Sequence, residues 1–545
     1  MAPAWRIGGP LPRFAVANGR IRTPVTLPGV LEGVNGTILE MAFTTFPDLL
    51  RRAAHRTPDA TFLRWSDRGR TLTFAETEAA TDRAASAFWD AGVRPGDRVG
   101  ILAHNGLDYI VAMWGAWKIG AISAHISVLV VDELADYVQA CTPKVLVYTH
   151  DALPAIERDR ANMPSITTYY CMDGPQEGAI AWADALSGAP SALPSVAVDD
   201  TMAAHLSFTS GSTGRPKGAV LAHGFTSRAA ACIAERLGLG PDDSSLGATG
   251  LASSYGLVVN LLPGVHRGMT VGLRKQWDPS AVWDDLHDNQ CTYFPANPPF
   301  LTDLLVESRK RGGAPQALRL VASGGAPVAP ELKRAYFDEL GVAFCESYGQ
   351  SELGGFVALG RPSRPSDERI GAVGEPLPDK EVRVLDDLGE EVPLGQPGEL
   401  CIRGGFMIGY WNEPEKTAEA TRDGWLHTGD VGRMDAGGFV TTLGRVSERI
   451  GSPTGPIYPR PIEEALQRHP SIRYAAVIPV GGQPAAVVTL WPEADSMDAR
   501  ALRAFYDAQP DADARLAMIE VIADMPMTPT GKLDKISLRK RFLGG

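Results

Sequence analysis

The segment "LSFTSGSTGRPKGAVLAHG", Leu206–Gly224, places a run of glycine and hydroxyl residues between two apolar stretches. Such small residues expose backbone N–H groups and hydroxyls, and Lys217 adds a mobile positive charge, so the turn predicts a cradle for a polyphosphate. It is not a Walker loop, because Pro216 stands where that motif has its second glycine and Gly218 follows the lysine in place of Ser or Thr. A flexible surface turn is the alternative interpretation.

Around this segment the chain alternates between helical and strand-like patterns. Within 44–150 the short runs "VGILA" and "VLVY" indicate buried strands, and a second alternating block covers about 200–345. Short strands and Gly-rich turns follow to about 445. At 545 residues the chain exceeds what one core usually holds. We expect an α/β fold with an N-terminal domain over 1–445, made of two α/β lobes (about 44–345) and a β-rich, distorted-barrel lobe (about 346–445), and a small mobile α+β domain over 446–545.

Composition and local sequence patterns argue against several classes of protein. The balance of 52 basic and 64 acidic residues gives a net charge of −12, which disfavours nucleic acid as a partner. Six cysteines lie far apart without a CxxC pair, which favours a reducing, cytoplasmic setting over a disulfide framework or zinc motif. No signal peptide is expected at the N-terminus. The uncharged stretch 245–265 contains Gly, Ser, Asn260 and Pro263, so we interpret it as a buried segment that lines a cleft and not as a membrane span.

Further motifs follow the opening segment in a fixed order. They are "SGGAP" (323–327), "ESYGQSE" (346–352), "GELCIRGGFMIGYWNEPEKT" (398–417), "GWLHTGD" (424–430), "GRVSERI" (444–450) and "PTGKLDK" (529–535). Together with "FTSGSTGRPKGAVLAH" (208–223) they resemble the adenylate-forming superfamily of acyl-CoA synthetases, luciferases and peptide-synthetase adenylation domains. The resemblance covers residue 44 to the end. It implies that ATP activates a carboxylic acid as an acyl-AMP with release of pyrophosphate.

This chemistry agrees with the residues present. A carboxylate is already a nucleophilic anion at neutral pH, so no general base is needed, and catalysis depends on positioning and charge neutralisation. The resemblance implies that Glu352 holds Mg²⁺, that Lys217 binds phosphate and that Lys532 bridges the carboxylate and the nucleotide. The implied nucleotide-binding residues are Thr209, Ser210, Gly211, Ser212, Thr213, Gly214, Lys217, Gly325, Ala326, Pro327, Glu346, Ser347, Tyr348, Gly349, Ser351, Asp430, Arg445 and Lys532.

Individual roles follow from chemistry within that resemblance. Tyr348 is similar to the ring that stacks on adenine, and Asp430 would accept hydrogen bonds from both ribose hydroxyls. His427, beside Asp430, is expected to be a packing residue. The acid pocket is expected near a position where the family commonly has an aromatic or histidine gate and this chain has Ser253. Its candidate lining is Ser253, Ser254, Tyr255, Gly256, Gly324, Gly349 and Gln350.

The chain departs from the family pattern after the arginine of "GRVSERI". Ser447 occupies the hinge position, where Asp or Lys is usual. In the next loop, "GSPTGPIYP", Pro453 and Thr454 replace the small residues that line the pantetheine tunnel of CoA ligases. Two acceptors therefore remain open: CoA, as in acid-CoA ligases, and an amine or amino acid, as in amide-forming members.

The remaining alternatives fit the sequence less well. A hydrolase would need GxSxG, and "GQSEL" fails at its last position. Glu352, Asp430 and Lys532 together argue against a non-catalytic nucleotide-binding module, and nothing specific supports a light-emitting oxygenase. We expect a stand-alone ligase, monomeric or homodimeric, that uses ATP, Mg²⁺, a carboxylic acid and CoA or an amine.

Overall fold

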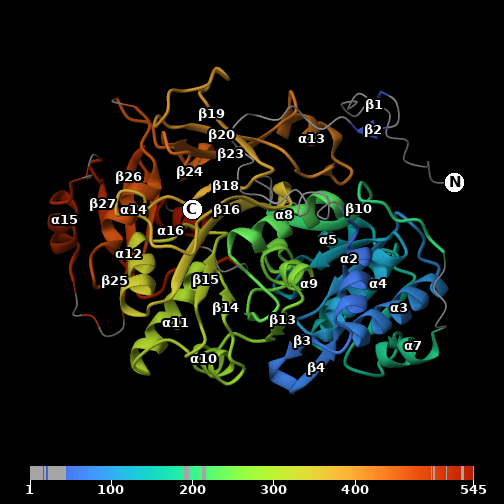
Figure 1. Ribbon diagram of the computed structural model, residues 1–545. Helices are drawn as coiled ribbons and strands as arrows, with labels where there is room; N and C mark the ends of the chain where they lie inside the picture. The colour runs from blue at the N-terminus through green and yellow to red at the C-terminus, as the bar shows by residue number, and fades with distance from the viewer. Residues whose placement is uncertain are drawn as a thin grey trace.

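Two large sheets, a β-rich lobe and a small C-terminal domain make up the fold (Figure 1). The computed structural model describes residues 16–17, 20–21, 44–189, 195–210, 216–453, 455–491, 494, 497–510, 512, 514–528 and 533–543. Near the N-terminus, β1 (Val16–Ala17) and β2 (Arg20–Ile21) form an antiparallel pair. The predicted α/β class is confirmed.

The first large sheet has eight strands in the order β21-β11-β10-β6-β5-β7-β8-β9. Its central pairs are parallel, whereas β10 and β11 form an antiparallel hairpin around the phosphate-loop motif. The runs "VGILA" and "VLVY" lie in β5 and β7, so both predicted strands are confirmed. The strands are β5 (Arg98–Leu102), β6 (Ile122–Ile126), β7 (Val145–Tyr148), β8 (Thr168–Cys171), β9 (Ile180–Ala181), β10 (Ala203–Ser210), β11 (Pro216–Ala222) and β21 (Gly409–Tyr410).

The second large sheet has nine strands in the order β18-β17-β16-β15-β14-β12-β13-β3-β4. Its central strands are parallel, as βα units require, and both edges are antiparallel. The strands are β3 (Thr61–Trp65), β4 (Arg70–Thr73), β12 (Ser244–Gly247), β13 (Thr270–Leu273), β14 (Tyr293–Pro295), β15 (Leu320–Ser323), β16 (Ala343–Gln350), β17 (Gly355–Leu359) and β18 (Glu375–Pro376).

Helices pack against both sheets and share one hydrophobic core with them. Trp114 and Trp117 on α4 are fully buried, and their indole N–H groups donate to the carbonyls of Phe46 and Ala204. Gly115 permits close packing of α4 on α3, because a Cβ there would lie 2.5 Å from the Cβ of Ala84. The helices of this core are α2 (Phe46–Arg56), α3 (Phe74–Asp90), α4 (Leu107–Lys118), α8 (His223–Arg236) and α9 (Leu262–Arg267).

Other helices cover the outer faces of the two sheets. Beside the first sheet lie α5 (Leu134–Cys141) and α7 (Trp182–Gly188), and beside the second α10 (Pro279–Asp288), α11 (Pro298–Lys310) and α12 (Pro330–Arg334) (Figure 1). Helix α6 (Leu153–Asp159) packs with α5 against the first sheet. The uncharged stretch 245–265 forms part of β12, a π-helical turn (Gly256–Leu261) and the start of α9, and most of it is buried. Within the described part of the chain, no helix is long and apolar enough to cross a membrane.

The β-rich lobe is a five-stranded antiparallel sheet that lies above the large sheets in Figure 1. It begins at Glu381, later than the expected 346, because β16 to β18 extend the nine-stranded sheet. Helix α13 (Pro414–Ala420) packs beside it. Its strands are β19 (Glu381–Leu385), β20 (Gly398–Arg403), β22 (Thr421–Arg422), β23 (Trp425–Met434) and β24 (Val440–Arg445).

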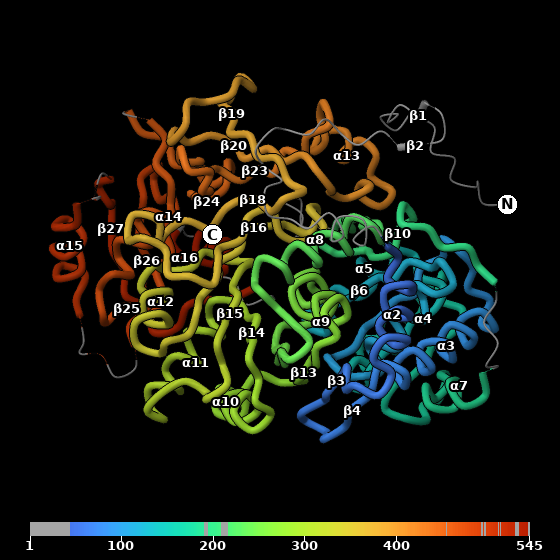
Figure 2. Tube along the Cα trace, viewed as in Figure 1, coloured from blue at the N-terminus to red at the C-terminus, as the bar shows by residue number. Residues whose placement is uncertain are grey.

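The C-terminal domain, in red at the left of Figures 1 and 2, has a three-stranded sheet and its own hydrophobic core. Its strands are β25 (Ile472–Val480), β26 (Gln483–Leu490) and β27 (Met518–Val521), and its helices are α14 (Pro459–Gln467), α15 (Ala499–Asp507) and α16 (Lys535–Leu543). A 3₁₀ turn, Val446–Glu448, connects it to β24 and contains the exposed Ser447.

Candidate functional site

The predicted phosphate cradle lies at the turn between β10 and β11. Lys217 is paired with Thr209 across this hairpin, and Ser210 is the last residue of β10. The predicted residues Gly211, Ser212, Thr213 and Gly214 lie outside the described residues. The hairpin therefore places Lys217 at the base of the predicted loop.

Lys217 and Glu352 both contact Tyr410. The Nζ of Lys217 lies 5.7 Å from the centroid of the Tyr410 ring, and the Tyr410 hydroxyl donates to Oε1 of Glu352 at 2.8 Å. Burial, and then the neighbouring Glu352 carboxylate, raise the pKa of Tyr410. The phenol therefore stays protonated and acts as a donor that orients the carboxylate.

Asp430 is the centre of a second group of predicted residues. Its Oδ2 accepts hydrogen bonds from the Tyr348 hydroxyl at 2.9 Å and from Nε2 of Gln350 at 2.5 Å. Nε of Arg445, its partner across β23 and β24, lies 3.4 Å from Oδ1. Asp430 is 9% exposed, and its carboxylate raises the pKa of Arg445. Burial, and then Asp430, raise the pKa of Tyr348 well above its usual value. These contacts fix the orientation of the Asp430 carboxylate.

Close packing explains the glycines of the "SGGAP" and "ESYGQSE" motifs. The Ser347 hydroxyl donates to the carbonyl of Ser323 at 2.7 Å, and a Cβ on Gly324 would lie 2.2 Å from that hydroxyl oxygen. A Cβ on Gly349 would lie 2.2 Å from the carbonyl oxygen of Gly355. Neighbouring protein atoms therefore fill the space beside both glycines. Gly325 has a φ of +79° and is exposed, followed by Ala326 and exposed Pro327.

The predicted acid-pocket residues of 253–256 form one turn against this motif. Ser253 accepts a hydrogen bond from the backbone N–H of Tyr255, and Ser254 is buried. The Tyr255 hydroxyl donates to the Ala322 carbonyl at 2.8 Å, and its ring lies beside Gly324 and packs edge-on against Phe356. The structure thus places Tyr255 and Gly324 at the carboxyl end of β15, whereas Gly256 lies against Gly250 and Leu251.

Glu346 belongs to a different environment from the one its motif implied. Its carboxylate contacts Lys333 on α12 and, at 3.1 Å, Arg460 on α14 of the C-terminal domain. All three side chains are buried. Burial opposes the charge on Arg460, yet Glu346 and Glu464 outweigh it and raise the pKa of this guanidinium. The contacts of Glu346 therefore place it in an ion cluster at the domain junction.

The remaining predicted residues lie in the C-terminal domain and its linker. Lys532 and Thr454 are outside the described residues. The loop that contains Pro453 is closed by an isolated bridge between Ile450 and Ile457, and Gly455 has a φ of +125°, a conformation that favours glycine.

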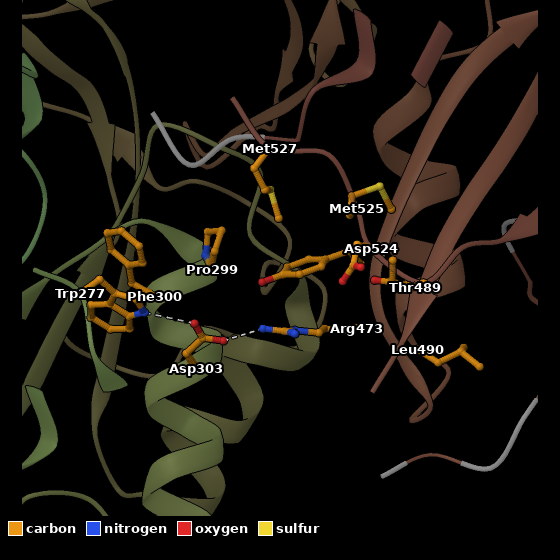
Figure 3. A pocket seen from close by; sticks show the side chains of 12 residues that line it. Trp277, Pro299, Phe300, Asp303, Arg473, Thr489, Leu490, Asp524, Met525 and Met527 are labelled. Atoms are coloured by element: carbon orange, nitrogen blue, oxygen red, sulfur yellow. Dashed lines mark hydrogen bonds and ion pairs between the residues drawn. The ribbon is translucent and has the colours of Figure 1, made fainter. Parts of the chain in front are cut away.

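A cavity of about 510 Å³ lies between the C-terminal domain and helix α11 (Figure 3). Asp303 on α11 accepts from Arg473 at 2.7 Å and from the Trp277 indole at 3.2 Å. The other walls include Phe300 and Met527. The cavity is outside the predicted site residues, but Met527 precedes Lys532 by five positions.

Sequence reasoning missed Tyr410 and Arg460. Tyr410 lies within the motif 398–417. The sequence of that motif does not show that β21 pairs with β11, which brings Tyr410 to Glu352. No sequence pattern predicted the role of Arg460, because a single sequence does not distinguish a buried arginine from one on the surface. Gln350 was predicted as acid-pocket lining, and the structure bonds it to Asp430.

A hairpin around the predicted phosphate loop, a buried carboxylate bonded to a tyrosine, and a separate C-terminal domain agree with an adenylate-forming ligase. The chain belongs to the family of AMP-binding enzymes, whose model matches residues 50–411. It activates a carboxylic acid with ATP.

Individual relatives cover nearly the whole chain. A feruloyl-CoA synthase from Amycolatopsis sp. is 32% identical over 90% of this chain and 98% of its own length. The solved structure of the anthranilate CoA ligase AuaEII in complex with anthranoyl-AMP has a TM-score of 0.86 at 26% identity, covering 92% of this chain and 98% of that one. The amide bond synthetase McbA from Marinactinospora thermotolerans has a TM-score of 0.80 at 27% identity, covering 91% and 99%.

Proposed function

We propose that this enzyme activates an aromatic carboxylic acid and transfers the acyl group to CoA. The observation that carries adenylation at this site is the convergence of Lys217 and Glu352 on Tyr410, next to the turn between β10 and β11. Support for an aromatic acid and for CoA comes from the names of the similar feruloyl-CoA synthase and anthranilate CoA ligase.

In the first step, a carboxylate oxygen of the acid attacks the α-phosphorus of ATP. The new P–O bond forms as the bond from the α-phosphorus to the bridging oxygen breaks, and pyrophosphate leaves. Lys217 would neutralise charge on the phosphates, and Asp430, fixed by Tyr348 and Gln350, would hold the ribose hydroxyls. Lys532 would bridge the two reactants.

Glu352 fits a magnesium ligand. Its carboxylate is half-buried and is oriented by the Tyr410 hydroxyl on Oε1, so Oε2 is the oxygen that would take part. Mg²⁺ prefers oxygen donors and uses one or two protein carboxylates together with phosphate oxygens and water. When bound, it would neutralise charge on the phosphates of ATP.

In the second step, the thiol sulfur of CoA attacks the acyl carbonyl carbon. The carbon–sulfur bond forms, the bond to the phosphate oxygen breaks, AMP leaves and the thiol proton is lost to solvent. The second candidate acceptor is an amine, which the similarity to McbA and the Pro453 loop favour. That loop cannot present the small surface that the pantetheine arm of CoA meets in the family pattern.

All six cysteines are buried and unpaired, which supports a reducing compartment such as the cytoplasm.

A pyrophosphate-release assay over a panel of cinnamic, benzoic, aliphatic and amino acids tests the proposed function. Each acid is run with CoA, with amines and with neither, and the product is identified by mass spectrometry. We expect release with aromatic acids and a CoA thioester. An amide product would establish the second candidate, and no release with any acid would contradict both.

A further inference from the structure

A cluster of three potential metal ligands lies in the β-rich lobe. Cys401 on β20 is the cross-strand partner of His427 on β23, and Glu399 is two residues before Cys401. Nδ1 of His427 lies 3.3 Å from Sγ of Cys401 and 2.9 Å from Oε2 of Glu399. The three ligand atoms lie within 4.8 Å of one another. The register of one strand pair thus brings together sulfur, nitrogen and oxygen donors.

The distances between the three ligand atoms would have to increase slightly to accommodate a zinc ion. Zinc bonds of about 2.0–2.3 Å in a tetrahedron place nitrogen and sulfur about 3.6 Å apart, and nitrogen and oxygen about 3.4 Å apart. The observed separations of 3.3 and 2.9 Å are shorter by about 0.3 and about 0.5 Å, which rotation of the partly exposed side chains of His427 and Glu399 can supply. Mixed thiolate, imidazole and carboxylate donors favour zinc over magnesium or calcium.

The three ligand residues differ in their exposure to solvent. Cys401 is fully buried, whereas the side chains of His427 and Glu399 are 16% and 23% exposed. Three protein ligands with access from solvent leave a fourth position for water, as in open zinc sites. Burial, and then the Glu399 carboxylate, raise the pKa of the Cys401 thiol to about 12, whereas nearby Arg422 acts in the opposite direction and also repels a cation. Zinc binds only the deprotonated thiol, so its binding must release this proton.

We propose that Glu399, Cys401 and His427 form a zinc-binding site, separate from the magnesium position at Glu352. On binding, the Cys401 thiol loses its proton to solvent, and the imidazole proton moves to Nε2 so that Nδ1 coordinates the ion. The second oxygen of Glu399, Oε1, accepts from the backbone N–H of Gly429 at 3.0 Å. The ion would therefore brace the turn that presents Asp430. The metal site itself does not rest on the proposed function.

Cobalt titration of the full-length enzyme, stripped of metal beforehand, tests the site. Co²⁺ reports thiolate ligation through a charge-transfer absorption band, and Zn²⁺ should displace it at one equivalent. Cys401→Ser, His427→Gln and Glu399→Gln should each weaken binding at least about 10-fold. Cys345→Ser is the matched control, because Cys345 is also buried but belongs to the core between the sheets. It should bind like the wild type.

A second measurement guards against variants that fail to fold. Zn²⁺ should raise the thermal unfolding temperature of the wild type and of Cys345→Ser, and leave that of folded Cys401→Ser unchanged, because binding to the native state alone stabilises it. Circular dichroism identifies the folded variants. Absence of a thiolate band in the wild type, or a band that survives all three substitutions, would overturn the proposal. Wild-type affinity for Co²⁺ in Glu399→Gln alone would also overturn the three-ligand site.

Discussion

The phenolic hydroxyl of Tyr348 donates a hydrogen bond of 2.9 Å to the carboxylate of Asp430. Tyr348 lies on β16 of the nine-stranded sheet and Asp430 on β23 of the β-rich lobe, so this bond joins two parts of the N-terminal domain. Gln350 adds a second bond to the same oxygen, Oδ2. The carboxylate proposed to bind ribose is therefore fixed by β16, the strand that also provides the Tyr348 ring proposed to stack on adenine.

Tyr348→Phe should weaken ATP binding while leaving the ring in place. A hydrogen bond contributes about 1 kcal/mol net, which corresponds to about a 5-fold rise in the KM for ATP. The rate at saturating ATP should change little, because the reacting phosphorus is held by other residues. Pyrophosphate exchange measured against ATP concentration gives both quantities.

Tyr336→Phe is the control for this change. Its hydroxyl is also buried and donates to a backbone carbonyl, that of Leu301, in the core around α11. It should lower stability without changing the KM for ATP. Equal kinetic effects of the two variants would contradict a specific role for Tyr348.

Glu352→Gln should raise the magnesium concentration needed for half-maximal adenylation and slow the reaction by about 10²–10³-fold. Tyr410→Phe should have a smaller effect in the same direction, because it only frees the Glu352 carboxylate. Magnesium titrations of acid-dependent pyrophosphate exchange measure both. Glu415→Gln, an exposed change on α13, serves as the control. A normal magnesium dependence in Glu352→Gln would refute the metal role.

The sequence predicted candidate site residues but not the residues that contact them. Motif order and the family resemblance predicted roles for Lys217, Glu352 and Asp430, because that chemistry requires specific side chains. Tyr410 and the Arg460–Glu346 contact depend on strand pairing and domain packing between distant segments, which local patterns do not encode. For the same reason the strands after 346 looked like the start of the β-rich lobe, although they extend the large sheet.

Lys532→Ala should retain ATP binding and lose acid-dependent pyrophosphate exchange by about 10²–10³-fold, because the proposed bridge between carboxylate and nucleotide is removed. ATP binding is followed by calorimetry and exchange by radiolabel. Lys540→Ala, in the last turn of α16, is the matched control. Exchange at the wild-type rate in the Lys532 variant would exclude the catalytic role.

Arg460→Met should destabilise the enzyme by about 3–5 kcal/mol, because it leaves the buried carboxylate of Glu346 and the partly buried carboxylate of Glu464 without this partner. Arg309→Met removes an ion pair with Glu339 whose side chains are half exposed, and should cost less than about 1 kcal/mol. The free energies of unfolding of the two variants, measured by urea denaturation, test this difference. Similar losses would show that the junction cluster contributes no more than a surface pair. Limited proteolysis near exposed Ser447 should also accelerate only in Arg460→Met.

Buried histidines should make the fold sensitive to acid. Burial lowers the pKa of His205 and His223 to about 3, and that of His266 to about 4, whereas the pKa of an unfolded histidine is about 6.5. The native state therefore binds fewer protons than the unfolded state, so stability is complete above about pH 6.5 and falls as the pH drops towards 3. Each histidine contributes a slope of up to about 1.4 kcal/mol per pH unit.

His205→Asn should flatten this dependence between pH 7 and about pH 5, whatever its effect on absolute stability. Within the described residues, neither ring nitrogen of His205 has a hydrogen-bond partner, and the facing ring is that of His125, whose pKa burial also lowers. Nothing there compensates a positive charge, so protonation must accompany unfolding. Unfolding free energies across this range test the slope. His55→Asn, an exposed change on α2, should keep the wild-type slope, and an unchanged slope in His205→Asn would contradict the prediction.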